Sequence, residues 1–132
     1  MSEKNVEIVR RSFEIWKSRD LSEVPDLTHP DFVLDLSRNI FNPDLYSGTD
    51  GIRLFFERVD EMWDELEVSA EEIIDGDDRV VVASRLQGVG RDGVEANMLV
   101  FQVWEFRDGK VVRLTGGFRE RGEALEAAGL SE

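Results

Sequence analysis

Residues 79–118 read RVVVASRLQGVGRDGVEANMLVFQVWEFRDGKVVRLTGGF, and this stretch decides the fold. Three long apolar runs are separated by two copies of Arg-Asp-Gly, at residues 91–93 and 107–109. Asp-Gly between apolar runs is among the strongest hairpin signals, because Gly accepts a positive φ and Asp caps its own turn. Each run is about twice the usual strand length. The stretch therefore predicts a long antiparallel meander that curls around something, and a curled sheet closed by helices predicts a cavity for a small molecule.

The residues before the meander predict the helices that cover it. Val6, Val9, Phe13 and Trp16 recur at helical spacing. The turn-rich residues 37–48, which include Ile40 and Phe41, predict a loop that folds over the mouth of a pocket. The other expected elements are a short helix near residues 21–27, a strand at 32–36, a helix from 49 or 50 to about 63, a strand at 66–74 and a last helix at 119–128.

This order of elements predicts the fold class. Helices precede a run of strands, and a short helix ends the chain, which is typical of an α+β layer arrangement. We expect one domain over residues 1–132, with N-terminal helices over the concave face of a curved, mostly antiparallel sheet of about five strands.

Composition limits the classes of function. The chain has 132 residues, 41% of them hydrophobic, and no cysteine, so it is a globular protein without disulfides or thiol chemistry. A formal net charge of −13 argues against nucleic acid and anionic membranes as partners. No apolar run reaches the length of a membrane span. We therefore expect no nucleic-acid partner, no membrane partner and a cytoplasmic location.

Five motifs in order resemble the SnoaL-like branch of the nuclear-transport-factor-2-like superfamily, which also holds ketosteroid isomerases, polyketide cyclases and limonene epoxide hydrolases. They cover nearly the whole chain: HPDFVLDL, YSGTDGIRLFF, IIDGDDRVVV, VFQVWEFRDGKVVRL and EALEAAGL. The resemblance implies a cone-shaped sheet with a pocket under the helices, and homodimers formed through the outer sheet face. It is specific for the fold and leaves the reaction open.

The resemblance also assigns candidate catalytic positions. Asp35, in HPDFVLD, matches the general-base Asp of ketosteroid-isomerase-like enzymes. The two oxyanion-hole positions of those enzymes fall on Ser12 and Leu99, which lack the required groups, so the steroid reaction is not expected. Phe118 and Glu120 match an aromatic-x-acid pattern that many SnoaL-like sequences carry at the end of the last strand.

The residues themselves leave the roles of two candidates open. Asp35 lies in an apolar strand; burial in a pocket would raise its pKa toward that of a useful base, whereas solvent exposure or a nearby Arg would make it structural. Arg85 and Gln87 lie in a strand that is apolar on both faces. Arg85 would orient a ligand, or pair structurally with a carboxylate such as Asp35 or Glu120.

Apolar residues supply the expected ligand contacts and the expected interface. The predicted pocket lining consists of Trp16, Tyr46, Phe55, Trp63, Gln87, Leu99, Phe101 and Phe118. Ordinary core packing is the alternative for the aromatic residues, and for Trp63 it is the favoured one. The strand from Val94 to Phe106 is apolar on both faces, which predicts either a homodimer interface or a C-terminal helix across the outer face.

Two functions remain in competition. One is an isomerase, cyclase or hydratase acting on a hydrophobic carbonyl compound, with Asp35 as proton shuttle and Arg85 and Gln87 polarising the oxygen. The other is a non-catalytic binding or accessory module. No metal is expected, because His29 is the only histidine, and no cofactor is expected.

Overall fold

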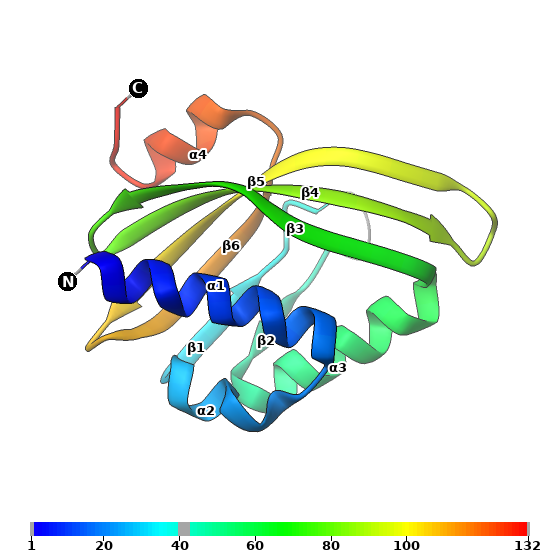
Figure 1. Ribbon diagram of the computed structural model, residues 1–132, viewed down its shortest axis with the longest axis horizontal. Helices are drawn as coiled ribbons and strands as arrows, with labels where there is room; N and C mark the ends of the chain where they lie inside the picture. Colours follow the sequence, from blue (N-terminus) through cyan, green and yellow to red (C-terminus); the bar gives the residue numbers. More distant parts are fainter. Residues whose placement is uncertain (1, 40–42, 132) are drawn as a thin grey trace.

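The computed structural model describes residues 2–39 and 43–131. It shows an α+β fold in which four helices surround one curved sheet of six strands (Figure 1). In chain order the elements are α1 (Ser2–Ser18), the 3-10 turn η1 (Leu21–Glu23), α2 (Val24–Leu27), β1 (Thr28–Asp35), β2 (Leu45–Ser47), α3 (Gly48–Met62), β3 (Trp63–Gly76), β4 (Arg79–Gly90), β5 (Glu95–Arg107), β6 (Lys110–Phe118) and α4 (Arg121–Ala127).

The sheet is mixed and mostly antiparallel, as predicted. Its strand order is β2-β1-β6-β5-β4-β3, and only the β1–β6 pair is parallel. The sheet has six strands instead of the expected five because β2 lies inside the turn-rich segment and places Tyr46 opposite Leu34 of β1. Three residues are too short for alternation to reveal a strand. The predicted lid residues Ile40 and Phe41 lie outside the described residues.

The two Arg-Asp-Gly turns form the hairpins that the sequence predicts. Gly93 has φ +87°, and Asp108 and Gly109 have φ +54° and +75°. In the second turn, the successive positive φ values of Asp108 and Gly109 give a twist that matches that of the flanking strands. The turns join β4 to β5 and β5 to β6, which pair along most of their lengths.

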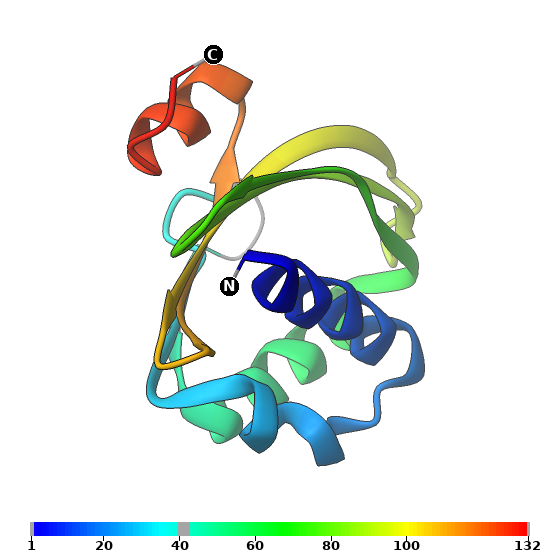
Figure 2. The same cartoon turned by 60° about the vertical axis from the view of Figure 1, so that its left-hand side comes forward.

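The helices α1 and α3 lie on the concave side of the sheet, and α4 lies on the other side (Figure 2). Strand alternation divides the apolar residues between these two sides. In β4, Val80 and Val82 pack with the α1 residues Ile8 and Val9 in the inner core. None of the four is more than 8% exposed, so β4 is apolar on this face because a helix covers it.

The opposite face carries a second core under α4. Val81, Phe101 and Phe118 pack there with Ala124 and Leu125 of α4. The C-terminal helix therefore covers part of the outer face, as one of the two alternatives for this apolar surface predicts. Because α1 covers the inner face and α4 covers part of the outer face, β4 and β5 read as nearly continuous apolar runs.

Helix α1 runs across the concave face and ends where the pattern predicts. Arg19 has φ +60° and its N–H donates to the carbonyl of Ile15, which closes the last turn. Near the start, the Asn5 side chain donates to the backbone carbonyl of Asp77 in the β3–β4 turn at 2.8 Å. This bond ties α1 to the sheet. None of the described helices offers an apolar stretch of membrane-spanning length.

Candidate functional site

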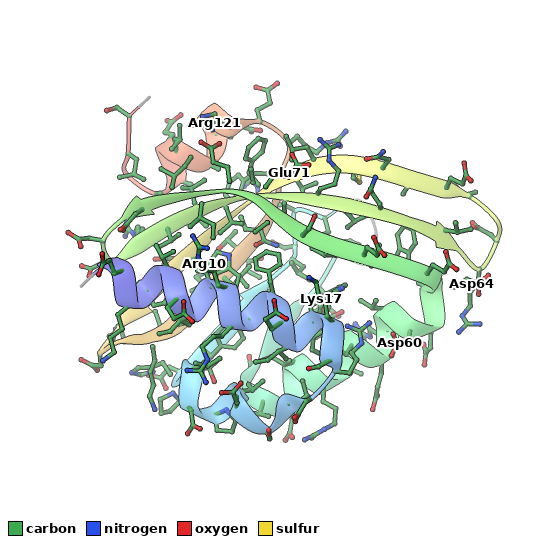
Figure 3. The ribbon with its side chains drawn as sticks, in the orientation of Figure 1. Arg10, Lys17, Asp60, Asp64, Glu71 and Arg121 are labelled. Atoms are coloured by element: carbon green, nitrogen blue, oxygen red, sulfur yellow. The ribbon has the colours of Figure 1, made fainter. Side chains whose placement is uncertain are left out.

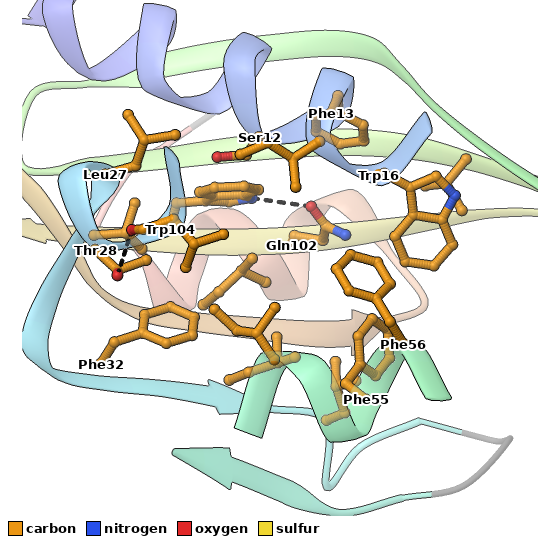
Figure 4. Close-up of a pocket in the computed structure, with 18 residues that line it drawn as sticks. Ser12, Phe13, Trp16, Leu27, Thr28, Phe32, Phe55, Phe56, Gln102 and Trp104 are labelled. Atoms are coloured by element: carbon orange, nitrogen blue, oxygen red, sulfur yellow. Dashed lines mark hydrogen bonds between the residues drawn. The ribbon is translucent and has the colours of Figure 1, made fainter. Parts of the chain in front are cut away.

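A cavity of about 150 Å³ lies between the concave face and the helices α1 and α3 (Figure 4). It is lined almost entirely by apolar side chains. The lining residues are Ser12, Phe13, Ile15, Trp16, Val24, Leu27, Thr28, Phe32, Leu34, Leu36, Ile52, Phe55, Phe56, Val68, Gln102, Trp104, Val111 and Leu114.

Alternation along the strands places these side chains in the cavity. Phe32, Leu34 and Leu36 are spaced by two and point inward, and Gln102 and Trp104 do the same from β5. The helices close the opposite wall. The cavity therefore lies against the inner face of the sheet, and in β1 and β5 every second residue is turned away from it.

Few polar atoms in this cavity are free to meet a ligand. The Ser12 hydroxyl donates to the carbonyl of Ile8 at 2.8 Å, and the Thr28 hydroxyl donates to that of Val24 at 2.7 Å. The Trp104 indole N–H donates to Oε1 of Gln102 at 2.9 Å (Figure 4). This bond fixes the Gln102 amide, and no described residue accepts a hydrogen bond from its Nε2 group.

Two smaller cavities, of about 110 and 70 Å³, adjoin the first. All three share Trp16 and Phe55, whose ring centroids are 5.7 Å apart. Phe55 also meets Tyr46 edge-on at 5.6 Å. The aromatic pair Trp16–Phe55 thus stands where the three cavities meet.

Four of the predicted ligand contacts lie at these cavities. Trp16 and Phe55 line all three, and Tyr46 and Trp63 line the 70 Å³ cavity. Trp63 is only 9% exposed, which agrees with a core role. The prediction missed five lining residues that alternation or helical spacing pointed to: Phe13, Phe32, Phe56, Gln102 and Trp104.

Asp35 lies on the face turned away from the cavities. Its neighbour Leu34 lines the main cavity, and Oδ2 of Asp35 accepts a hydrogen bond from Arg113 at 2.5 Å. Burial acts to raise the pKa of the carboxyl, but hydrogen bonds from Ser37 and the Arg113 guanidinium outweigh it, so the pKa lies below its usual value. The pKa of Asp35 is therefore not raised, as burial in a pocket would have required.

Arg85 and Gln87 also occupy outward positions, because their neighbours Ser84 and Leu86 line a cavity. The Arg85 guanidinium bonds Glu71 at 3.0 Å and Asn97 at 3.2 Å. The carboxylate partner of Arg85 is therefore Glu71, on the neighbouring strand β3, and neither Asp35 nor Glu120, which the sequence suggested. Glu71 projects from the side of the sheet opposite α1 (Figure 3).

The remaining predicted contacts are outward as well. Leu99, Phe101 and Phe118 pack in the core under α4. Arg38 lies over the Phe118 ring at 4.4 Å. Glu120 precedes α4, is exposed and makes no capping hydrogen bond with its side chain. The strands are apolar on both faces, so the sequence offered no contrast that identified the inner one.

Comparison with known proteins supports the fold. No curated protein matches the chain. An NTF2-like protein of unknown function from Burkholderia pseudomallei is 25% identical, with a TM-score of 0.75 over 97% of this chain and 98% of that one. TerC, co-crystallized with polyporic acid, is 23% identical, with a TM-score of 0.74 over 95% and 97%.

A protein with a ketosteroid isomerase-like fold from Catenulispora acidiphila, in complex with trimethylamine, is 15% identical, with a TM-score of 0.72 over 95% and 94%. The SnoaL-like domain profile matches residues 9–114, which run from α1 through the cavity-lining part of β6. The cone-shaped sheet, the helices over its concave face and this match lead to one conclusion: the chain belongs to the SnoaL-like domain family.

Proposed function

We propose that this protein binds a small, largely apolar molecule in the cavity between the sheet and the helices α1 and α3. The observation that carries the proposal is the cavity itself, an apolar wall with one oriented amide, that of Gln102. Ligand sites of this kind combine apolar lining with a few placed polar groups. Relatives with this fold have been obtained with trimethylamine and with polyporic acid.

The contacts of the site favour ligand binding without proton transfer over acid–base catalysis. An isomerase, cyclase or hydratase needs a proton acceptor within hydrogen-bond reach of the substrate. Asp35 is the sequence candidate, but it is paired with Arg113 and its pKa is lowered. The carboxyl therefore stays ionised and engaged on the outer face. A non-catalytic binding module fits these contacts better than acid–base catalysis by Asp35.

The test uses 2-naphthamide, a neutral aromatic probe, and the intrinsic fluorescence of the tryptophans that line the cavity. We expect saturable quenching in the wild-type protein. Leu114→Phe narrows the cavity from β6 and should abolish binding, because Leu114 faces inward. Thr115→Phe, the matched control, adds the same ring on the outward side of that strand and should bind as the wild type does.

A second measurement concerns natural ligands. Native mass spectrometry of the freshly purified protein should reveal an added small-molecule mass that the Leu114→Phe protein lacks. Equal probe binding by the wild type and by a correctly folded Leu114→Phe protein, together with no ligand mass in either, would overturn the proposal.

A further inference from the structure

The binding of an apolar molecule gives no role to one buried polar group, the hydroxyl of Ser84. Ser84, in β4, is 0% exposed, and its hydroxyl has no hydrogen-bond partner among the described residues. Buried hydroxyl groups are normally satisfied, because burial without a hydrogen bond costs stability. An unpaired one in a cavity wall is therefore a feature that calls for a partner from outside the chain.

Ser84 faces the 110 Å³ cavity, which is more polar than the main one. Asn39, Gln102 and Arg119 share its lining with Ser84. The side chains of Ser84, Gln102 and Arg119 can all donate hydrogen bonds. No carboxylate is among the described lining residues, and no ion pair joins Arg119 to any of the residues that the structure describes. The donors have no acidic partner here, so the cavity suits an oxygen acceptor.

The polar cavity continues from the apolar one. Five residues line both: Trp16, Leu36, Phe55, Val68 and Gln102. Gln102 stands at the junction, where its Oε1 accepts from the Trp104 indole and no described residue accepts from its Nε2. A ligand that fills both cavities therefore has an apolar body and an oxygen at one end.

Charge decides which kind of oxygen fits. Arg119 is the one ionisable residue in the polar cavity's described lining, and it is cationic. Guanidinium groups recognise carboxylates in particular, through strong charge-assisted hydrogen bonds. The net charge of −13 repels anions in general, so any preference for an anion has to arise locally, from Arg119 and its neighbours.

We propose that the ligand is an apolar organic acid bound as its carboxylate, with the apolar body in the main cavity and the carboxylate against Ser84, Gln102 and Arg119. This inference rests on the proposed binding function and adds the ligand's chemical class. Ser84 and Gln102 donate to the carboxylate oxygens, and Arg119 balances the charge at the exposed end.

The test compares 2-naphthoate with 2-naphthamide, which share a shape and differ in charge, by titration at neutral pH. The wild-type protein should bind 2-naphthoate about tenfold more tightly, the value of one charge-assisted hydrogen bond. Arg119→Gln should remove this preference, because it weakens the binding of 2-naphthoate much more than that of 2-naphthamide. Arg107→Gln removes the same charge from the β5–β6 turn, far from the lining, and should keep the preference.

Ser84→Ala separates a ligand contact from a structural role. It should weaken 2-naphthoate binding several-fold, and the free protein should unfold at the same or a higher temperature than the wild type, because an unpaired hydroxyl has been removed. A lower unfolding temperature with unchanged 2-naphthoate affinity would show a structural hydroxyl and overturn the inference.

The outcomes also separate the two proposals. Equal affinity for both probes, unaffected by Arg119→Gln but abolished by Leu114→Phe, would overturn the organic acid while the apolar site stands. Probe binding that Leu114→Phe leaves intact would overturn both proposals.

Discussion

Arg113 donates a hydrogen bond to Oδ2 of Asp35 at 2.5 Å, on the face of the sheet opposite the cavities. The Asp35 side chain is 14% exposed, and that of Arg113 is 41% exposed. The pair joins β1 to β6, the one parallel contact of the sheet. Asp35, which matches the general-base position of ketosteroid-isomerase-like enzymes, thus joins two strands here.

Asp35→Asn should therefore change stability and leave ligand binding unchanged. We expect the free energy of unfolding to fall by about 1 kcal/mol at neutral pH, a modest value because Arg113 is partly in water. Glu57→Gln, an exposed control on α3, should have no comparable effect. Denaturant unfolding measures the difference, and loss of probe binding in a folded Asp35→Asn protein would contradict the structural role.

The same pair predicts a pH dependence. The pKa of Asp35 in the folded protein is below its ordinary value of 3.8, because hydrogen bonds from Ser37 and Arg113 outweigh burial, so the folded state favours the ionised carboxyl. Its contribution to stability is complete above that value and is lost as the pH falls through the folded pKa. The difference in unfolding free energy between the wild type and Asp35→Asn should therefore be constant from neutral pH down to about 5 and should shrink below about 4. A difference that grows on acidification would contradict it.

The Trp104–Gln102 hydrogen bond should couple the two residues energetically. Trp104 is 5% exposed, so Gln102→Leu leaves a buried indole N–H unpaired and should cost about 1–2 kcal/mol. In a Trp104→Phe background the same substitution should cost clearly less, giving a coupling energy of about 1 kcal/mol. Denaturant unfolding of the four proteins completes the cycle, and additive effects would argue against the bond.

Gly117 should tolerate no side chain. Its φ is +85°, and a Cβ there would lie 2.8 Å from the backbone carbon of Arg38. Gly117→Ala should cost about 3 kcal/mol, from backbone strain plus the clash. Gly93→Ala is the matched control, because Gly93 has φ +87° in open space and should cost only about 1 kcal/mol. Equal losses of unfolding free energy would show that the close approach does not matter.

The homodimer stays a prediction, limited to the outer surface that α4 leaves uncovered. Leu99 packs at the margin of the outer core and is partly exposed. Light scattering after size exclusion should give twice the mass of one chain, and Leu99→Glu should give monomers. Val94→Glu, at a 60% exposed position near the β4–β5 turn, is the control. A wild-type protein of single-chain mass would contradict the interface.

Long elements could be predicted from the sequence, whereas the shortest strand could not. The hairpins of residues 79–118 and helix α1 carry many periodic positions and two Asp-Gly turns, and each lies close to where it was predicted. Strand β2 was missed because three residues hold no period. Of the predicted site residues, Trp16 and Phe55 line the cavities, whereas Asp35 and Arg85 point away from them.

The sequence by itself determined the curved sheet and the helices that cover it. Alternation, Asp-Gly turns and helical spacing are local signals, and they suffice for a curled sheet with helices over it. What only the tertiary structure decided was which face of each strand is inside. Both faces of β4 and β5 are apolar, because α1 covers one and α4 covers part of the other. Because successive side chains of a strand point to opposite faces, Ser84 lies in the cavity wall and the next residue, Arg85, lies outside it.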